Sequence, residues 1–345
     1  MTKVVVRPFE NTDSRDEVER LRDWQSSEWR WLGSHPLADR MHRWVVDADG
    51  EIVGHLAALP QYYRINGRRV VAHTPARYMV LPGYGFYAVA LMRKFFRACE
   101  NCVACDELPA VIGIETRLGA EEAGRFRSTA KLLNVAGVPG FPASIPASTT
   151  RLFNWGLRAV DRALTATVLV DDDFRVEVLE GFDEAFDGLF ESVAAAVPCV
   201  PEKDAAFLRW RYGPDSPQSP VTVLGVREGE TLLGYAVLKL YAGGHTGDVL
   251  DLTTRPGRRD VARALLRGAV HHFRRLRVHS VRYRLVQSPS SPRSSDLWRL
   301  GFVARRRNRP TLLVKFADSA LHETAKDTAR WSYSHGDGER SFWRT

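Results

Sequence analysis

Two stretches of the chain, 43–59 and 221–240, alternate apolar and polar positions in the same way. Each consists of two apolar runs joined by a short charged turn that contains glycine, at 49–50 in the first stretch and at 228–229 in the second. Such alternation is typical of a β-hairpin, because successive side chains of a strand point to opposite faces. The pattern therefore predicts one hairpin in each half of the chain.

Other matching features surround the two hairpins in the same order. A tryptophan–arginine–aromatic triplet precedes each hairpin, at 29–31 and at 210–212, with four residues between each triplet and a proline. After each hairpin an apolar strand ends at a proline, Pro82 or Pro256, and an amphipathic helix follows a short loop. Several matches in one order predict that the chain contains an internal repeat.

The repeat divides the chain into two tandem domains and a tail. We place an N-terminal domain with a linker helix at 1–170, a C-terminal domain at 171–316 and the tail at 317–345. A length of 345 residues agrees with two domains. Four aromatic residues predict that the tail packs against the rest of the protein: Trp331, Tyr333, Phe342 and Trp343.

The composition is that of a globular protein, with 44% apolar and 26% charged residues, which argues against disorder. No stretch approaches the roughly 18–20 apolar residues of a membrane span. The first residues lack the apolar core and the cleavage site of a signal peptide. We therefore expect a cytoplasmic location and no membrane partner. The net charge of +8, mostly from arginine, fits either an anionic partner or a solvated basic surface.

Cys99, Cys102 and Cys105 form a C-x-x-C-x-x-C spacing, while the fourth cysteine, Cys199, is remote. Three thiolates in this spacing suit a metal ion or an iron–sulfur cluster, but a fourth ligand is not nearby. The surrounding segment, 91–105, also reads as a helix on which the three small side chains share one buried face. We therefore expect no metal site.

In each half the expected order is strand, helix, hairpin, then a strand, proline, loop and helix, then a last strand and helix. This order resembles the GNAT N-acyltransferase superfamily in duplicate. The W-R-Y-x4-P signature at 210–217 is similar to that of GNAT-like proteins from bacterial polysaccharide or natural-product pathways. The resemblance implies an α/β fold of two tandem GNAT-like domains, each a mixed twisted sheet flanked by helices.

The resemblance also implies a cleft for acetyl-CoA or another acyl-CoA between two splayed strands. The pyrophosphate lies on backbone N–H groups of the loop that opens the following helix. In the first half this loop keeps two glycines, whereas in the second half it keeps only Gly257, and Asp260 adds a negative charge. We therefore expect the first half to bind the cofactor, through these residues: Met79, Val80, Leu81, Gly83, Tyr84, Gly85, Phe86 and Tyr87.

Three residues are candidates for catalysis. Glu115 ends an expected strand at 110–117, where a carboxylate in the cleft would take a proton from an attacking amine, and Tyr78 reaches the same cleft. Asp251 lies on an expected strand at 247–254 of the second half, where a buried carboxylate needs a partner or solvent. The alternatives are a helix-start or surface residue for Glu115 and a structural salt bridge with an arginine for Asp251.

The tyrosine that protonates the leaving thiolate in many members of the superfamily has no counterpart here. Its position is occupied by Leu297 in the second half, and the nearest equivalent in the first half is Thr129. This departure leaves open whether either half catalyses transfer.

The leading hypothesis is an acyl-CoA-dependent N-acyltransferase acting on a small polar amine. One alternative is a non-catalytic binding or scaffold protein on the same fold, and another is an aminoacyl-tRNA-dependent transferase. The arginine-rich runs at 274–285 and 304–310 accompany no recognised nucleic-acid-binding motif. We therefore expect no nucleic-acid partner and keep tRNA for the last alternative only.

Overall fold

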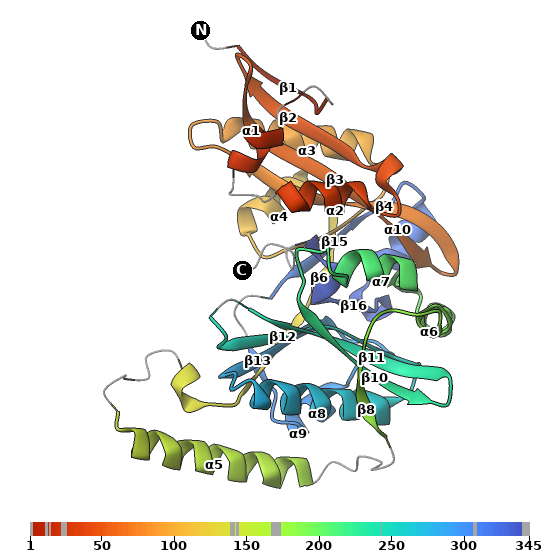
Figure 1. The fold of residues 1–345 in the computed structure, drawn as a ribbon. Coiled ribbons are helices and arrows are strands. Elements are labelled where there is room, and N and C mark those ends of the chain that lie inside the picture. Colours follow the sequence, from red (N-terminus) through yellow and green to blue (C-terminus); the bar gives the residue numbers. More distant parts are fainter. Residues whose placement is uncertain are drawn as a thin grey trace.

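Two mixed sheets make up the protein, one above the other in Figure 1, with helices on their faces. The computed structural model describes the following residues: 3–10, 13, 15–21, 26–138, 142, 145–166, 174–241, 243–305 and 309–339. Within these residues each sheet has eight strands, and the fold is the expected α/β arrangement of two tandem halves.

The first sheet follows the order β1-β2-β3-β4-β5-β15-β6, and β9 pairs with β3. Neighbouring strands are antiparallel except β4 and β5, which are parallel. The strands are β1 (Val4–Pro8), β2 (His42–Ala48), β3 (Glu51–Ile65), β4 (Arg68–Val80), β5 (Cys102–Asp106), β15 (Thr311–Lys315), β6 (Glu121–Arg125) and β9 (Cys199–Pro201).

The second sheet repeats this plan in the order β14-β7-β13-β12-β11-β10-β8, and β16 pairs with β13. Here β12 and β13 form the parallel pair. The strands are β14 (Val303–Arg305), β7 (Arg127–Leu132), β13 (Ser280–Val286), β12 (Thr246–Thr254), β11 (Thr231–Leu240), β10 (Val221–Glu228), β8 (Val176–Leu179) and β16 (Tyr333–Ser334).

One long helix covers a face of each sheet, α3 on the first and α8 on the second. The α-helices are α1 (Arg15–Arg20), α2 (Ser26–Gly33), α3 (Phe86–Ala98), α4 (Pro109–Arg117), α5 (Ala147–Ala166), α6 (Ala185–Ala194), α7 (Ala205–Tyr212), α8 (Arg259–Arg275), α9 (Ser294–Arg299) and α10 (Ser319–Ala325). Short 3-10 helices are η1 (Ala38–Arg40), η2 (Val135–Gly137), η3 (Thr328–Arg330) and η4 (His335–Asp337). Among the described helices, none combines the length and apolar character that a membrane crossing needs.

Both predicted hairpins are confirmed. Asp49 and Gly50, which connect β2 to β3, have φ angles of 52° and 93°. Positive φ at both central residues is the requirement of a type I′ turn, whose twist matches that of the strands. Gly229 provides a positive φ of 57° between β10 and β11. The local turn chemistry therefore sets these two registers.

The two halves exchange a strand. β7 follows β6 in the chain but lies in the second sheet between β13 and β14. Conversely, β15 comes late in the chain but lies in the first sheet between β5 and β6. Each sheet is therefore completed by a strand from the other half, while the predicted sequence boundary near residue 170 stays a prediction.

The repeated triplets meet between the halves. Trp31 of α2 and Trp210 of α7 stack with ring centroids 4.5 Å apart and planes 7° from parallel. Each indole Nε1–H donates to the other tryptophan's carbonyl oxygen, at 2.7 and 2.9 Å. The sequence match aligned Trp29 with Trp210, but Trp29 stacks instead on Phe9.

The tail packs on the body as expected. Trp331 is fully buried and donates from Nε1 to the carbonyl oxygen of Ala325 at 2.6 Å. Tyr333 is also buried, in β16. Phe342 and Trp343 lie outside the described residues.

Three expected elements are wrong. The last helix expected in the first half is replaced by the strands β6 and β7. The segment 110–117 forms most of helix α4 rather than a strand, because Pro109 occupies its first turn and Gly119, with φ of 98°, follows its end. The segment 91–105 is not one helix, since α3 ends at Ala98 and β5 begins at Cys102. At the break, the Asn101 side chain binds backbone atoms of neighbouring segments instead of continuing the helix.

The cysteines therefore lie on a loop and a strand. Burial raises the pKa of the Cys99 thiol to about 12 and that of Cys102 well above its ordinary value. Such thiols remain protonated and poor ligands at neutral pH. No group of three potential metal ligands is found among the described residues.

The strand exchange predicts that fragment 1–170 does not fold alone. Without β15, β5 and β6 lose their shared neighbour, and the buried side chains of 312–314 leave a gap in the first core. We expect no cooperative transition when the fragment is heated and followed by circular dichroism. Co-expression with 171–345 is expected to restore the transition, whereas cooperative unfolding of 1–170 by itself would contradict the prediction.

Candidate functional site

An opening separates β4 and β5 in the first sheet. The two parallel strands pair only at His73 and Cys102. Thr74 Oγ1 donates to the Val103 carbonyl oxygen at 2.7 Å, and beyond this contact no further pair joins the strands, although β4 continues to residue 80. Beyond this point the backbones of β4 and β5 no longer pair with each other.

A β-bulge in β4 borders this opening. The ladder with β3 shifts register after His55, so that Arg77 and Tyr78 lie opposite one residue of β3. Arg77 has a φ of 52°, and its backbone N–H donates to Glu339 Oε1 in the tail at 3.0 Å. Its buried guanidinium pairs with Glu28. The bulge thus directs one backbone donor toward a carboxylate in the opening.

Helix α4 places Glu115 beside both diverging strands. Its side chain is only 1% exposed, and Oε2 has no hydrogen-bond partner among the described residues. Burial and, to a smaller extent, the charge of Asp106 on β5 raise its pKa to about 8. The Glu115 charge in turn raises the pKa of Tyr78 on β4 and of Cys102 on β5. This carboxyl therefore titrates near neutral pH at the base of the opening.

Tyr78 contributes a second unpartnered polar atom. Its hydroxyl is buried with no hydrogen-bond partner among the described residues. Burial, followed by the Glu115 charge, raises its pKa above the ordinary value of 10.0. Buried polar atoms are nearly always hydrogen-bonded, and these atoms of Glu115 and Tyr78 are two of the exceptions within the described residues.

The expected cofactor residues lie at the end of β4 and in the loop before α3. Leu81 N–H donates to the Val53 carbonyl oxygen at 2.8 Å, and Gly83 turns the chain with a φ of 94°. The N–H groups of Gly85 and Phe86 donate to no backbone carbonyl of the described chain. The first turn of α3 carries no acidic residue, and the Phe86 side chain is 83% exposed. This helix terminus can accept an anion.

The corresponding opening of the second sheet is filled by the tail. β12 and β13 pair only from Thr246 to Val249 on the β12 side. Farther along β13, β16 adds as an antiparallel strand through Tyr333 and Ser334, and η4 packs against both β12 and β13. The tail therefore adds a strand at the divergence of the second sheet, whereas its contact with β4 is the hydrogen bond from Arg77 N–H to Glu339.

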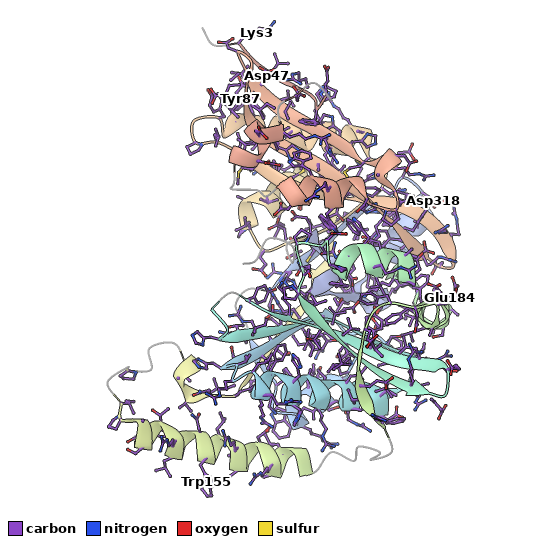
Figure 2. All side chains as sticks on the ribbon, in the orientation of Figure 1. Lys3, Asp47, Tyr87, Trp155, Glu184 and Asp318 are labelled. Carbon is purple, nitrogen blue, oxygen red and sulfur yellow. The ribbon has the colours of Figure 1, made fainter. Side chains whose placement is uncertain are left out.

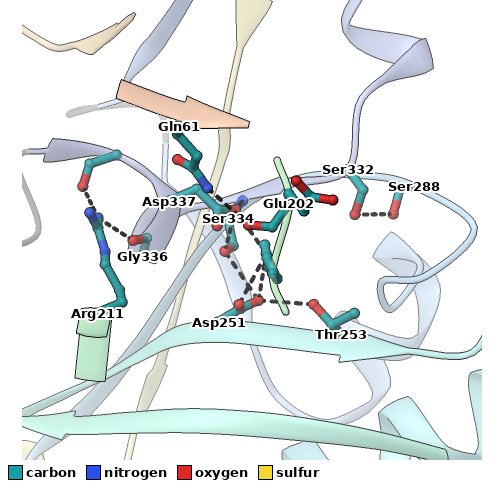
Figure 3. A network of polar contacts seen from close by, with 12 residues as sticks. Gln61, Glu202, Arg211, Asp251, Thr253, Ser288, Ser332, Ser334, Gly336 and Asp337 are labelled. Atoms are coloured by element: carbon teal, nitrogen blue, oxygen red, sulfur yellow. Dashed lines mark hydrogen bonds and ion pairs between the residues drawn. The ribbon is translucent and has the colours of Figure 1, made fainter. Parts of the chain in front are cut away.

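Asp251 belongs to this filled opening (Figure 3). Lys203 Nζ lies 3.0 Å from Asp251 Oδ2 and 2.9 Å from Asp337 Oδ2. The Tyr235 hydroxyl donates to Asp251 Oδ2 at 2.8 Å, and Ser334 Oγ donates to Oδ1 at 3.2 Å. All these residues are buried. The network ties β12 to the tail and satisfies both carboxylate oxygens with protein donors.

The start of α8 is occupied as well. Asp260 in its first turn forms an ion pair with Arg258 at 2.9 Å. Hydrogen bonds from Arg258 and from the backbone of the same turn lower the pKa of Asp260, although burial opposes them. Arg259 pairs with Asp296 at 2.9 Å. An anionic ligand bound at the start of α8 would therefore lie next to the Asp260 carboxylate.

Of the predicted catalytic residues, the structure brings Glu115 and Tyr78 together and places Asp251 in the other half. Sequence reasoning missed the bulge at Arg77 and the approach of Glu339. Neither leaves a local signal, because a bulge depends on the register of the neighbouring strand and the path of a tail on tertiary contacts.

Comparisons with known proteins agree with this architecture. No protein-family model and no curated protein sequence matches the chain. Among solved structures, a GCN5-related N-acetyltransferase from Anabaena variabilis is similar over 92% of this chain and 74% of its own, with 12% identity and a TM-score of 0.59. One from Kribbella flavida covers 93% and 72%, with 15% identity and a TM-score of 0.57.

Saccharomyces cerevisiae N-myristoyltransferase with bound myristoyl-CoA is also similar, over 90% of this chain and 82% of its own. The identity is 10% and the TM-score 0.58. At such identities the likeness concerns the fold. The chain therefore has the fold of the tandem GNAT-like N-acyltransferases.

Proposed function

We propose that the protein is an acyl-CoA-dependent N-acyltransferase that acts on a small polar amine and binds the acyl-CoA in its first half. One observation carries this proposal: the two repeats treat equivalent features differently. In the first half the start of α3 offers backbone N–H groups without backbone acceptors, and the described tail adds no strand between β4 and β5. Their counterparts at β12, β13 and α8 are filled by the tail and by Asp260.

The diphosphate of acetyl-CoA or a longer acyl-CoA would lie on the N–H groups of Gly85 and Phe86, where a helix start favours negative charge. The chain between diphosphate and thioester would follow the end of β4, along 79–81. Tyr84 and Tyr87 are half-buried beside the loop and would border the same path. No metal ion is required by this arrangement.

The same cleft contains groups suited to acyl transfer. The amine nitrogen attacks the thioester carbonyl, the C–S bond breaks, and the ammonium proton passes to the Glu115 carboxylate. The Arg77 N–H would polarise the carbonyl oxygen after Glu339 releases it. Tyr78 would return a proton to the leaving thiolate. Asp251 has no place in these steps and instead holds the tail.

A non-catalytic binding protein is the second candidate, favoured by the Glu339 carboxylate on the Arg77 N–H. In that case the tail would keep the acyl site permanently closed. The experiments below separate the two, because a closed site neither binds acyl-CoA nor turns it over.

Gly85→Trp is expected to abolish acyl-CoA binding, because the indole would cover the N–H groups at the start of α3. For the natural chain, a ligand at 100 times its Kd adds about 2.7 kcal/mol of stability. If the 345 residues unfold as one unit, this corresponds to a rise of roughly 4 °C in Tm. The measurement is thermal unfolding with acetyl-CoA and with longer acyl-CoAs.

The matched control is Gly257→Trp in the equivalent loop of the second half. Each variant is compared with its own ligand-free Tm, so that a loss of intrinsic stability cancels. If Gly257→Trp loses the Tm shift and Gly85→Trp keeps it, the cofactor binds the second half and our proposal is contradicted. No shift in the natural chain would favour the non-catalytic candidate.

Glu115→Gln is expected to lower kcat/KM by about 10²–10⁴-fold, the usual contribution of a general base. A base with a pKa of about 8 becomes competent as it loses its proton. The natural enzyme should therefore show kcat/KM rising with pH up to about 8 and level above it, and the variant should lack this limb. CoA release with a panel of small amines provides the rate.

The same substitution has an expected effect on stability. The folded chain keeps the Glu115 proton up to about pH 8, whereas the unfolded chain releases it near 4.5, so the free energy of unfolding falls as pH rises between these values. Glu115→Gln should remove this fall, and Glu100→Gln on the surface should not. An unchanged pH–rate profile in Glu115→Gln would exclude Glu115 as the base.

Asp251→Asn is expected to destabilise the fold by about 3–5 kcal/mol, because it leaves Lys203 with an incomplete set of buried partners. The acyl-CoA shift should persist in this variant. Urea unfolding provides the stability, with the exposed Asp215→Asn as control. A stable Asp251→Asn protein that has lost turnover would instead support a catalytic role for Asp251.

A further inference from the structure

Helix α5 lies beyond the second sheet and forms one end of the molecule (Figure 1). It contacts the body through its polar side. Asn154 Oδ1 accepts from Val135 N–H at 2.9 Å, and Asn154 Nδ2 donates to Asn134 at 3.1 Å. About two helical turns farther along α5, Asp161 forms ion pairs with Lys131 and Arg274.

The opposite side of α5 is apolar and exposed. Leu152, Phe153, Trp155 and Val160 expose between 53% and 68% of their surface. Their spacing places them on the face opposite Asn154 and Asp161, since successive residues are about 100° apart on a helix. Trp155 points away from the body in Figure 2. A helix that binds the body by its polar side leaves its apolar face for another partner.

Arginines follow one edge of this face. Arg151, Arg158 and Arg162 have helical spacings of seven and four residues, which align them along the helix. Behind this edge, α5 and α8 enclose a cavity of about 580 Å³. More arginines line the cavity from the body: Arg274, Arg275 and Arg277.

The charge of this region is positive within the described residues. Asp161 is the one carboxylate among the described residues that line the cavity, and it is engaged by Lys131 and Arg274. The acidic stretch 171–173 lies outside the described residues. The apolar face therefore adjoins a basic edge, and the cavity on the body side of that edge is basic as well.

We propose that α5 docks this protein on an anionic lipid bilayer. Leu152, Phe153, Trp155 and Val160 would enter the boundary between headgroups and acyl chains, as the apolar face of an interfacial helix does. Tryptophan is suited to this depth because its ring is amphipathic. The arginine edge would meet the phosphate groups, which attract basic residues near the membrane surface.

A second copy of the chain fits this face less well. If two α5 helices packed antiparallel by their apolar faces, symmetry would bring the arginine edge of one against that of the other. Like charges would then oppose the contact, whereas an anionic surface neutralises them. Docking of this kind needs no membrane-spanning helix, so it departs from the expectation of no membrane partner, which rested on the lack of a spanning segment.

The test is co-sedimentation of the full chain with vesicles of phosphatidylcholine, with and without phosphatidylglycerol. We expect binding to the anionic vesicles that weakens as salt is raised. Phe153→Ser combined with Trp155→Ser should lower the partition coefficient more than about tenfold. Arg151→Gln combined with Arg158→Gln should lower it about 25-fold, about fivefold for each arginine.

The matched control variants change residues in the first half of the chain. Leu108→Ser with Val5→Ser removes exposed apolar side chains, and Arg93→Gln with Arg97→Gln removes exposed arginines from α3. These variants should bind vesicles like the natural chain. An unchanged Tm for every variant shows that the fold is intact.

Three outcomes would overturn the proposal. The first is no binding of the natural chain to anionic vesicles. The second is binding that depends on the arginines but not on Phe153 and Trp155, which would make it purely electrostatic. The third is a concentration-dependent dimer without lipid, lost in the Phe153→Ser, Trp155→Ser variant, which would assign the face to a second copy.

Discussion

The reciprocal placement of β7 and β15 is the constraint on which the other features depend. A strand that is hydrogen-bonded on both sides cannot shift without breaking two ladders at once. Because each half contributes such a strand to the other's sheet, the halves cannot reorient as separate domains usually can. The stacked Trp31 and Trp210, bonded to each other's carbonyls, lie at a second point of this junction.

Within this fixed frame the two repeats have acquired different physical roles. In both, a pair of parallel strands diverges next to the start of a long helix. In the second half the tail adds β16 to the diverging edge, and Lys203 neutralises the facing carboxylates of Asp251 and Asp337. In the first half the described tail adds no strand between β4 and β5, and Glu115 and Tyr78 lie near each other beside the divergence. Repetition of the backbone therefore did not lead to repetition of the site.

Much of the fold could be predicted because its signals are local. Turn glycines and alternating apolar positions specified the hairpins, and a proline followed by an amphipathic pattern specified the strand–loop–helix units. Glu115 was assigned to a strand because the run around Gly113 is apolar and short, although Pro109 and Gly119 mark the two ends of a helix. The sequence therefore contains the two boundary signals of a helix, and the strand prediction overlooks them.

The sequence could not predict the strand exchange, the bulge at Arg77 or the partners of Asp251. Asp251 was expected on a strand and lies on one, but Lys203 and Ser334 reach it from distant parts of the chain. Periodicity describes which face of an element is buried, and it contains no information on which distant segment covers that face.

The exchange also has a consequence for synthesis on the ribosome. The first sheet needs residues 311–315, which emerge long after its other strands. At about 5–20 residues per second, the edges of β5 and β6 wait roughly 10–40 s for their neighbour. Unpaired edges of this kind invite pairing with other chains. The nascent protein is therefore expected to depend on chaperones during that interval, however stable the finished fold is.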